Sequence, residues 1–287
     1  MSIKVLITGA NGQLGKTLKD ESLNLNEEYC FTFVTKAELD ITNQKEIEFF
    51  FSEEEYHYCI NCAAYTNVDQ AEESPKIAFK VNAEAVKNLA KTCKKTNTTL
   101  IHISTDYVFD GTKKSPYLET DNPNPINEYG KSKLKGEQYI QNNHDKYFII
   151  RASWLYSKYG NNFLKTIIKK VKQGDKLNII STQVGTPTSC NDLSRFIFQI
   201  IRTQNTEYGI YNFSAKGKTT WYDYALLISK HFPEYDPSWI VKIDRINSKT
   251  RRPLYSVLDN AKSQKTQPNQ SNWQNSVNEV VVSILNN

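Results

Sequence analysis

Residues 3–18 read IKVLITGANGQLGKTL, a strand pattern that runs into three glycines and then into a helix pattern. Glycines between a strand and a helix allow a tight turn, let the backbone approach a pyrophosphate, and permit close helix packing. The helix N-terminus adds N–H donors for an anion. The spacing of Gly9, Gly12 and Gly15 is one residue wider than the usual dinucleotide fingerprint, and a plain strand-to-helix turn would also satisfy it. Because it follows the first strand of an alternating chain, we interpret it as a dinucleotide cradle.

Short apolar runs alternate with longer amphipathic segments through the first half of the chain. Examples are CFTFVT (30–35), QKEIEFFFSE (44–53), TLIHIS (99–104) and KYFIIRAS (146–153). Repeated strand and helix units imply parallel strands joined by right-handed crossovers. We predict an α/β fold, a Rossmann-type doubly wound parallel sheet over residues 1–153, to which about 181–213 return. Residues 154–287 are expected to form mainly a smaller α+β substrate domain.

Composition and charge exclude several classes of protein. The net charge of +5 is spread over 287 residues, which is too mild for a nucleic-acid-binding protein and still suits a small anionic ligand. No run of eighteen apolar residues occurs and the N-terminus lacks the pattern of a signal peptide, so we expect a cytoplasmic protein without membrane contact. Cys59 and Cys62 have C-x-x-C spacing but lie in a buried-strand pattern, and the four scattered histidines form no metal-ligand cluster.

Tyr129 and Lys133 are four residues apart in a helix pattern, so their side chains share one face. A nearby ammonium favours a phenolate and lowers the pKa of a phenol, so Tyr129 is a candidate proton donor. The pair alone carries little weight among 17 tyrosines and 36 lysines and arginines. Thr105 strengthens it, because it ends the strand before a long loop, where ligands bind open α/β sheets. Ser104 is the competing hydroxyl, and the alternation along the strand does not choose between them.

The cofactor is expected to be chosen by the residues that follow the second strand. An acidic residue there accepts the ribose hydroxyls of NAD, whereas a basic one favours the 2′-phosphate of NADP. Thr35 and Lys36 occupy this place. They favour NADPH, with NADH as the alternative, since Lys36 can equally be a solvated surface residue.

Nine longer motifs then give the chain a family resemblance. They are GANGQLG (9–15), LDIT (39–42), NCAAYTNVDQAE (61–72), STDYVFDG (104–111), PNPINEYGKSKLKGE (123–137), RASWLY (151–156), GNNFLKT (160–166), QVGTPTS (183–189) and RRPLYSVLDN (251–260). With them the chain resembles the extended short-chain dehydrogenase/reductases, and within these the dTDP-4-dehydrorhamnose reductase family. The resemblance implies NAD(P)H-dependent reduction of the C4 ketone of dTDP-4-dehydro-β-L-rhamnose to dTDP-L-rhamnose, for polysaccharide biosynthesis.

The resemblance also assigns site residues. It implies that the catalytic residues are Thr105, Tyr129 and Lys133. The implied cofactor-binding residues are Tyr129 and Lys133 together with Gly9, Asn11, Gly12, Gln13, Leu14, Asp40, Ile41, Ala63, Ala64 and Tyr65. The implied substrate-binding residues are Thr105, Asp106, Trp154 and Arg252. Trp154 can equally be a core aromatic, and Arg251 and Arg252 a solvated turn rather than a diphosphate clamp. Thymine is expected against Trp221 or Tyr222.

Magnesium and oligomeric state are left open by the resemblance. Some members are dimers bridged by magnesium through carboxylates, but Thr17 stands where an acid of the first helix would be expected. A metal site is therefore not predicted, and the chain is expected to be a monomer or a homodimer.

Three other functions fit the same motifs. One is a related 4-ketoreductase for another nucleotide-activated 6-deoxysugar, and another is the non-catalytic NADP-binding regulatory subunit of methionine adenosyltransferase. The third is an epimerase or dehydratase, which is disfavoured because Asp106 has no adjacent glutamate.

Overall fold

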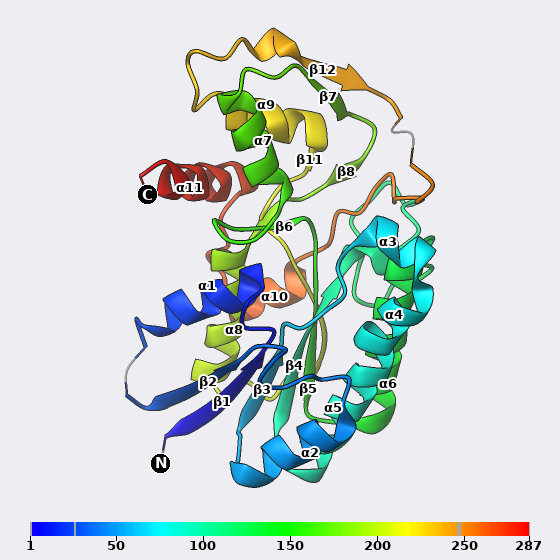
Figure 1. The fold of residues 1–287 in the computed structure, drawn as a ribbon, viewed down its shortest axis with the longest axis vertical. Coiled ribbons are helices and arrows are strands. Elements are labelled where there is room, and N and C mark those ends of the chain that lie inside the picture. Colours follow the sequence, from blue (N-terminus) through cyan, green and yellow to red (C-terminus); the bar gives the residue numbers. More distant parts are fainter. Residues whose placement is uncertain (1, 26, 246–247, 287) are drawn as a thin grey trace.

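The computed structural model describes residues 2–25, 27–245 and 248–286 and contains a central parallel sheet (Figure 1). Its six strands run in the order β10-β5-β4-β3-β1-β2, and every neighbouring pair is parallel. Their bounds are β1 Ile3–Thr8, β2 Tyr29–Val34, β3 Tyr58–Asn61, β4 Thr99–Thr105, β5 Tyr147–Ala152 and β10 Gly209–Phe213. The chain reverses its direction of travel across the sheet beside β1, which creates a topological switch point between β1 and β3. The predicted fold class is confirmed.

Helices cover both faces of the sheet (Figure 1). One face packs on α1 (Gln13–Ser22) and α8 (Cys190–Arg202), and the other on α2 (Gln44–Glu53), α5 (Ala85–Lys95) and α6 (Glu128–Asn143). The strands alternate accordingly, since Val5 and Ile7 lie in the first core and Leu6 in the second. All three side chains are fully buried, as expected for a sheet covered on both sides.

The helical segment before β4 is built from three pieces. They are α4 (Pro75–Phe79), a π-helical turn η1 (Lys80–Glu84) and α5, and the short helix α3 (Val68–Glu73) precedes them. The loop between β4 and α6 begins with the 3-10 turn η2 (Asp106–Val108). π turns within helices often mark functional places, and this one faces α6, which carries Tyr129 and Lys133.

A smaller part of the molecule lies above the carboxyl ends of the strands (Figure 1). It contains α7 (Phe163–Lys172), α9 (Trp221–Ser229), η3 (Pro237–Trp239) and α11 (Trp273–Leu285). Its short strands pair two by two: β6 (Leu155–Tyr156) with β9 (Thr188–Ser189), β7 (Leu177–Ile180) with β12 (Ile240–Ile243), and β8 (Val184–Gly185) with β11 (Thr219–Thr220). A separate apolar core holds these elements together.

The chain crosses between the two parts more than once. After residue 153 it returns through α8 and β10, whose side chains belong to the core of the large sheet. The later helix α10 (Ala261–Thr266) also reaches back, with Lys262 Nζ donating to the Ile210 carbonyl at 2.7 Å. We therefore propose a division near residue 153 with two later returns. No helix in the described part of the chain is long and apolar enough to cross a membrane.

Candidate active site

The glycine turn has the geometry of a phosphate cradle. Gly9 has a φ of +67°, and a Cβ there would lie 2.6 Å from the Ala63 amide nitrogen. A Cβ on Gly15 would lie 2.6 Å from the Gly9 carbonyl oxygen, so the helix can pack this closely on the turn only when residue 15 is glycine. At Gly12, a Cβ would meet only that same oxygen, at 3.2 Å, so this position borders open space. The three glycines therefore shape a turn that keeps room for a ligand at its middle member.

The N-terminus of α1 opens at this turn without a side-chain cap. Gly12 is the N-cap residue, and the first turn contains no acidic side chain. The Gln13 side chain turns away and donates to the Leu155 carbonyl at 3.3 Å, while Leu14 is buried in the core. Gln13 and Leu14 can therefore offer only backbone N–H groups to an anion, as helix N-termini do.

A cavity of about 360 Å³ lies in front of this helix end, at the carboxyl ends of β1, β2 and β3. It is lined by eight of the predicted cofactor residues and by five further ones: Gly9, Asn11, Gly12, Asp40, Ile41, Ala63, Ala64 and Tyr65, then Lys36, Leu39, Thr42, Cys62 and Val81. The switch point between β1 and β3 thus carries a cavity whose glycine turn and helix end fit a dinucleotide.

Opposite charges stand together at this cavity. The exposed Lys36 ammonium is 3.8 Å from an Asp40 carboxylate oxygen. Partial burial raises the pKa of Asp40, but hydrogen bonds from Thr42 and the charge of Lys36 outweigh it and hold that pKa below its usual value. Lys36, which the sequence left as either a ligand or a surface residue, is both exposed and part of the cavity wall.

The two adjacent hydroxyls at the end of β4 point to different surroundings. Ser104 Oγ donates to Glu137 Oε1 at 2.5 Å, inside the protein. Glu137 and Arg151 form a buried ion pair with an N···O distance of 2.7 Å, and their side chains are 0% and 2% exposed. Thr105 instead engages Asp106 Oδ1 at 3.2 Å and accepts from the Tyr107 amide. The structure therefore assigns Ser104 to the interior and leaves Thr105 as the hydroxyl beside Tyr129.

Tyr129 is half-buried near the start of α6. Burial raises the pKa of its phenol to about 12; a hydrogen bond with Thr105 opposes this rise, and the charge of Asp106 adds to it. The expected lowering of this pKa by Lys133 is not found. The Lys133 ammonium is instead bound to the Ile103 carbonyl at 2.6 Å and lies 3.3 Å from His102 Nε2.

Lys133 itself is almost completely buried, with 2% of its surface exposed. Burial lowers its pKa to about 8, although the charges of Glu137 and Cys62 act in the opposite direction. Cys62 also lines the dinucleotide cavity, so this amine is close to the wall of that cavity.

Asp106 is buried beside the catalytic candidates, with 2% of its surface exposed. Its Oδ2 has no hydrogen-bond partner among the residues that the structure describes, and burial raises the pKa of the carboxyl to about 7 despite hydrogen bonds from Ser256 and Thr105. An unpaired buried acceptor costs free energy unless a ligand supplies a donor. Asp106 therefore fits a contact to a substrate hydroxyl.

A second cavity, of about 550 Å³, lies beside Tyr107. Its lining comes from both parts of the molecule: Asp69, Tyr107, Phe163, Asn178, Ile179, Ile180, Gln183, Trp221, Ser248 and Arg252. The Tyr107 ring in its wall meets the Tyr129 ring edge-on, with centroids 5.9 Å apart. Each catalytic candidate thus adjoins a residue that lines a cavity: Lys133 adjoins Cys62 of the first cavity, and Tyr129 contacts Tyr107 of the second.

Trp154 reaches this second cavity only through another indole. It stacks on Trp221, with ring centroids 3.6 Å apart and planes 10° apart, and Trp221 lines the cavity. A Cβ on Gly185 would lie 2.5 Å from the Trp154 ring, so glycine makes room for this stack. Of the two residues considered for thymine, Trp221 lines the cavity, whereas Tyr222 packs under the Lys242 ammonium.

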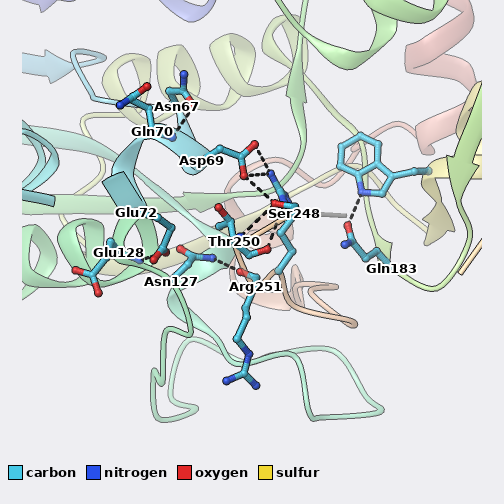
Figure 2. A network of polar contacts seen from close by, with 12 residues as sticks. Asn67, Asp69, Gln70, Glu72, Asn127, Glu128, Gln183, Ser248, Thr250 and Arg251 are labelled. Carbon is cyan, nitrogen blue, oxygen red and sulfur yellow. Dashed lines mark hydrogen bonds and ion pairs between the residues drawn. The ribbon is translucent and has the colours of Figure 1, made fainter. Parts of the chain in front are cut away.

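Arg252 joins Asp69 to Ser248, and all three residues line this cavity. Its Nη2 donates to both Asp69 carboxylate oxygens, at 2.7 and 2.8 Å, and its Nη1 donates to Ser248 Oγ. Asn127, the cap of α6, donates to the Arg251 carbonyl at 2.9 Å. The Arg251 side chain points away from this network (Figure 2), so only Arg252 of the pair faces the second cavity.

Sequence reasoning missed several residues that build the site. Asn82, in the π turn, is fully buried and holds the Tyr65 backbone at both its N–H and its carbonyl, at 2.8 and 2.9 Å. Its amide also donates to Ser132 Oγ at 3.0 Å, which ties the Tyr65 segment to α6. The available signal was a polar residue on the face of the helix pattern that Ala78, Ala85, Val86 and Leu89 mark as apolar.

The residues present do not fit a magnesium ion. Thr17 donates to the Gln13 carbonyl within α1, and the Asp192 oxygens are engaged by Ser276 and Arg195. Among residues 2–25, 27–245 and 248–286 no group of three histidine, cysteine, aspartate or glutamate side chains could hold a metal.

Comparison with known proteins identifies the family. The RmlD substrate binding domain family matches residues 3–285. A dTDP-4-dehydrorhamnose reductase of Aggregatibacter actinomycetemcomitans is 36% identical over 96% of this chain and 98% of its own length. A dTDP-4-keto-6-deoxy-D-glucose reductase of Streptomyces niveus is 34% identical over 90% of this chain and 89% of its own length. The crystal structure of the Bacillus anthracis dTDP-4-dehydrorhamnose reductase in complex with NADP aligns with a TM-score of 0.93 and 38% identity, over 99% of this chain and 100% of that one. This chain therefore belongs to the RmlD substrate binding domain family, that of the dTDP-4-dehydrorhamnose reductases.

Proposed function

We propose that this protein reduces the C4 ketone of dTDP-4-dehydro-β-L-rhamnose to dTDP-L-rhamnose with NADPH. The observation that carries the proposal is that Lys133 adjoins Cys62, in the wall of a cavity that fits a dinucleotide, while Tyr129 contacts Tyr107, in the wall of a second cavity lined by aromatic and charged side chains. The full-length likeness to dTDP-4-dehydrorhamnose reductases supports the substrate. We further propose that it acts in the cytoplasm, as a monomer or a homodimer.

The catalytic residues supply a proton and hold the reacting oxygen. NADPH, when bound, supplies the hydride. Tyr129 donates its phenolic proton to the C4 oxygen, and its raised pKa ensures that it carries this proton at neutral pH. Thr105 hydrogen-bonds the same oxygen, because its hydroxyl adjoins Tyr129. Lys133 stabilises the phenolate that remains and binds the cofactor ribose.

The second cavity supplies the contacts to the nucleotide sugar. Asp106 offers its unpaired Oδ2 to a sugar hydroxyl. Trp221, backed by Trp154, offers an aromatic face to the base or sugar. Arg252 is already oriented by Asp69 and lines the cavity wall, where a guanidinium suits a diphosphate.

We propose NADPH rather than NADH as the cofactor. Lys36 lines the first cavity and is largely exposed, so its ammonium is free to meet a 2′-phosphate. The Bacillus anthracis relative was solved with NADP, which supports the same choice. Replacing Lys36 with alanine should raise the KM for NADPH and leave that for NADH unchanged.

A second candidate substrate has its own support. The Streptomyces niveus relative is named for dTDP-4-keto-6-deoxy-D-glucose, an epimer of the proposed substrate at C3 and C5. Turnover of the two ketosugars by the same preparation separates the candidates, because the preferred substrate should have the higher kcat/KM.

One variant tests catalysis against a purely regulatory, NADP-binding role. In Tyr129→Phe, the proton donor is lost but the ring and the cavity stay, so kcat should fall by on the order of 100-fold or more with NADPH affinity kept. NADPH oxidation in the presence of the ketosugar is followed by absorbance. A wild-type protein that binds NADPH and never consumes it with either ketosugar would contradict the proposal.

A further inference from the structure

A buried histidine, His102 of β4, lies beside the Lys133 amine. The ring is fully buried, with Nε2 3.3 Å from Lys133 Nζ and Nδ1 3.1 Å from Asn61 Nδ2. The reaction proposed above uses neither His102 nor Asn61. Because Lys133 is part of the catalytic set, the hydrogen-bonding state of this ring bears on the site.

The surroundings of Asn61 fix the proton on this ring. Asn61 Oδ1 accepts from Thr8 Oγ1 at 2.8 Å and from the Ala63 amide at 3.2 Å. Because these two donors lie at the same end of the Asn61 side-chain amide, that end is the oxygen, and the Asn61 NH₂ group faces His102 Nδ1. That nitrogen must accept, and a neutral imidazole then carries its proton on Nε2.

This proton faces Lys133. An amine accepts a hydrogen bond from the Nε2–H of His102, whereas an ammonium has no lone pair and meets a second donor. The Ile103 carbonyl, at 2.6 Å, accepts from either form. The contact to His102 therefore favours the amine where Lys133 now lies and disfavours the ammonium there.

We propose that His102 is a positioning residue for Lys133: locked by Asn61 with its proton on Nε2, it holds Lys133 as an amine beside β4 and directs the ammonium toward the cofactor cavity. The catalytic consequence rests on the proposed function, whereas the state of the ring does not.

The charges around the pair agree with this arrangement. Burial, and then the charge of Lys133, lower the pKa of His102 well below its usual value, so the ring stays neutral. Burial brings the pKa of Lys133 to about 8, so amine and ammonium are both accessible near neutral pH. The other titratable groups that act on Lys133 are Glu137 of α6, which is paired with Arg151, and Cys62 after β3.

The ring state can be measured directly without any activity. The chain has four histidines, so ¹⁵N-histidine NMR is simple to assign, with His102→Gln identifying the signal. We expect a ring that is neutral and protonated on Nε2 from neutral to alkaline pH, because burial lowers the pKa of His102 well below its usual value. A ring protonated on Nδ1, or an imidazolium in this range, would overturn the proposal.

Two substitutions test the effect on Lys133. In Asn61→Asp, the carboxylate accepts from Thr8, from the Ala63 amide and from the ring, so the ring proton moves to Nδ1 and Nε2 can accept from the ammonium. His102→Leu removes the opposing donor altogether. Both should move the alkaline fall of kcat/KM for NADPH, which reports the free enzyme, upward by about one pH unit.

His144→Gln is the matched control, since His144 is also buried in the α/β layer but bonds the Thr98 carbonyl. It should leave the pH profile unchanged. A merely structural role for His102 would lower rates in both test variants without moving the profile, and that result would refute the proposal. If the protein reduces no ketosugar, the ¹³Cε titration of Lys133 gives the same comparison, so failure of the proposed function is told apart from failure of this inference.

Discussion

Asp106→Asn gives a sharp test of the site, because the proposed substrate contact is a buried carboxyl whose ionisation destabilises the folded protein. Burial raises the pKa of Asp106 from 3.8 to about 7. The native carboxyl therefore holds its proton more tightly than the unfolded one. The contribution of this group to the free energy of unfolding is fully present below the unfolded pKa of 3.8. It decreases as the pH rises from there to the native pKa of about 7, and it does not change further at higher pH. Asparagine resembles the protonated carboxyl and has no ionisation to lose.

The magnitude follows from the size of the shift. Each unit of pKa difference corresponds to about 1.4 kcal/mol, so the full cost at alkaline pH approaches ~4 kcal/mol. Between about pH 5 and about pH 8 the variant should gain about 3 kcal/mol relative to the wild type, at ~1.4 kcal/mol per pH unit up to neutrality. With 2% of its surface exposed, Asp106 needs little correction for solvent screening.

Urea unfolding followed by far-UV circular dichroism at several pH values measures this gain. Dichroism is preferable to fluorescence because the four tryptophans, at 154, 221, 239 and 273, all belong to or pack against the core of the smaller part, whereas Asp106 directly follows β4 of the large sheet. Asp110→Asn is the control: hydrogen bonds, first from the Thr112 amide, hold the pKa of Asp110 at about 2, so its effect should not vary over this range. A stability difference for Asp106→Asn that is equally independent of pH would refute the reasoning.

The remaining predictions concern the hydroxyl pair and the glycine turn. Ser104→Ala should lower the free energy of unfolding by ~2 kcal/mol, since it removes a buried hydrogen bond to a carboxylate, and should leave kcat nearly unchanged. Thr105→Val should lower kcat on the order of 100-fold, with little loss of stability. Chemical unfolding and steady-state kinetics measure the two effects, and a loss of kcat in Ser104→Ala with a loss of stability in Thr105→Val would contradict the assignment. Gly9→Ala should weaken NADPH binding at least about tenfold, since its Cβ would collide with the backbone after β3. Gly174→Ala is its control, because Gly174 has a φ of +69° but a Cβ there would meet no atom nearer than 3.8 Å. NADPH affinity is measured by fluorescence titration, and an equal loss of affinity in both variants would contradict the clash at Gly9.

The fold was predictable because its signals are local and repeat along the chain. Strand and helix patterns, and a glycine turn after the first strand, are each set by neighbours in sequence, and together they require a doubly wound sheet. The π turn at Lys80–Glu84 was not predictable, because it depends on packing between helices. A Cβ on Gly136 of α6 would lie 2.2 Å from the Asn82 carbonyl, so the two helices approach through a glycine that the sequence pattern did not mark.

The members of the candidate site could be proposed from the sequence, but their electrostatics could not be predicted from it. Thr105, Tyr129 and Lys133 were named from position and spacing, but the choice between Ser104 and Thr105 depends on Glu137, a residue 33 positions away that meets Ser104 only in the folded chain. Spacing also suggested that Lys133 would lower the Tyr129 pKa, because residues four apart share a helix face. The fold instead directs the lysine toward β4, where the Ile103 carbonyl and His102 hold it, and burial raises the phenol pKa. Proximity in sequence thus indicates which groups can interact, whereas the contacts that each side chain makes in the folded protein determine its pKa.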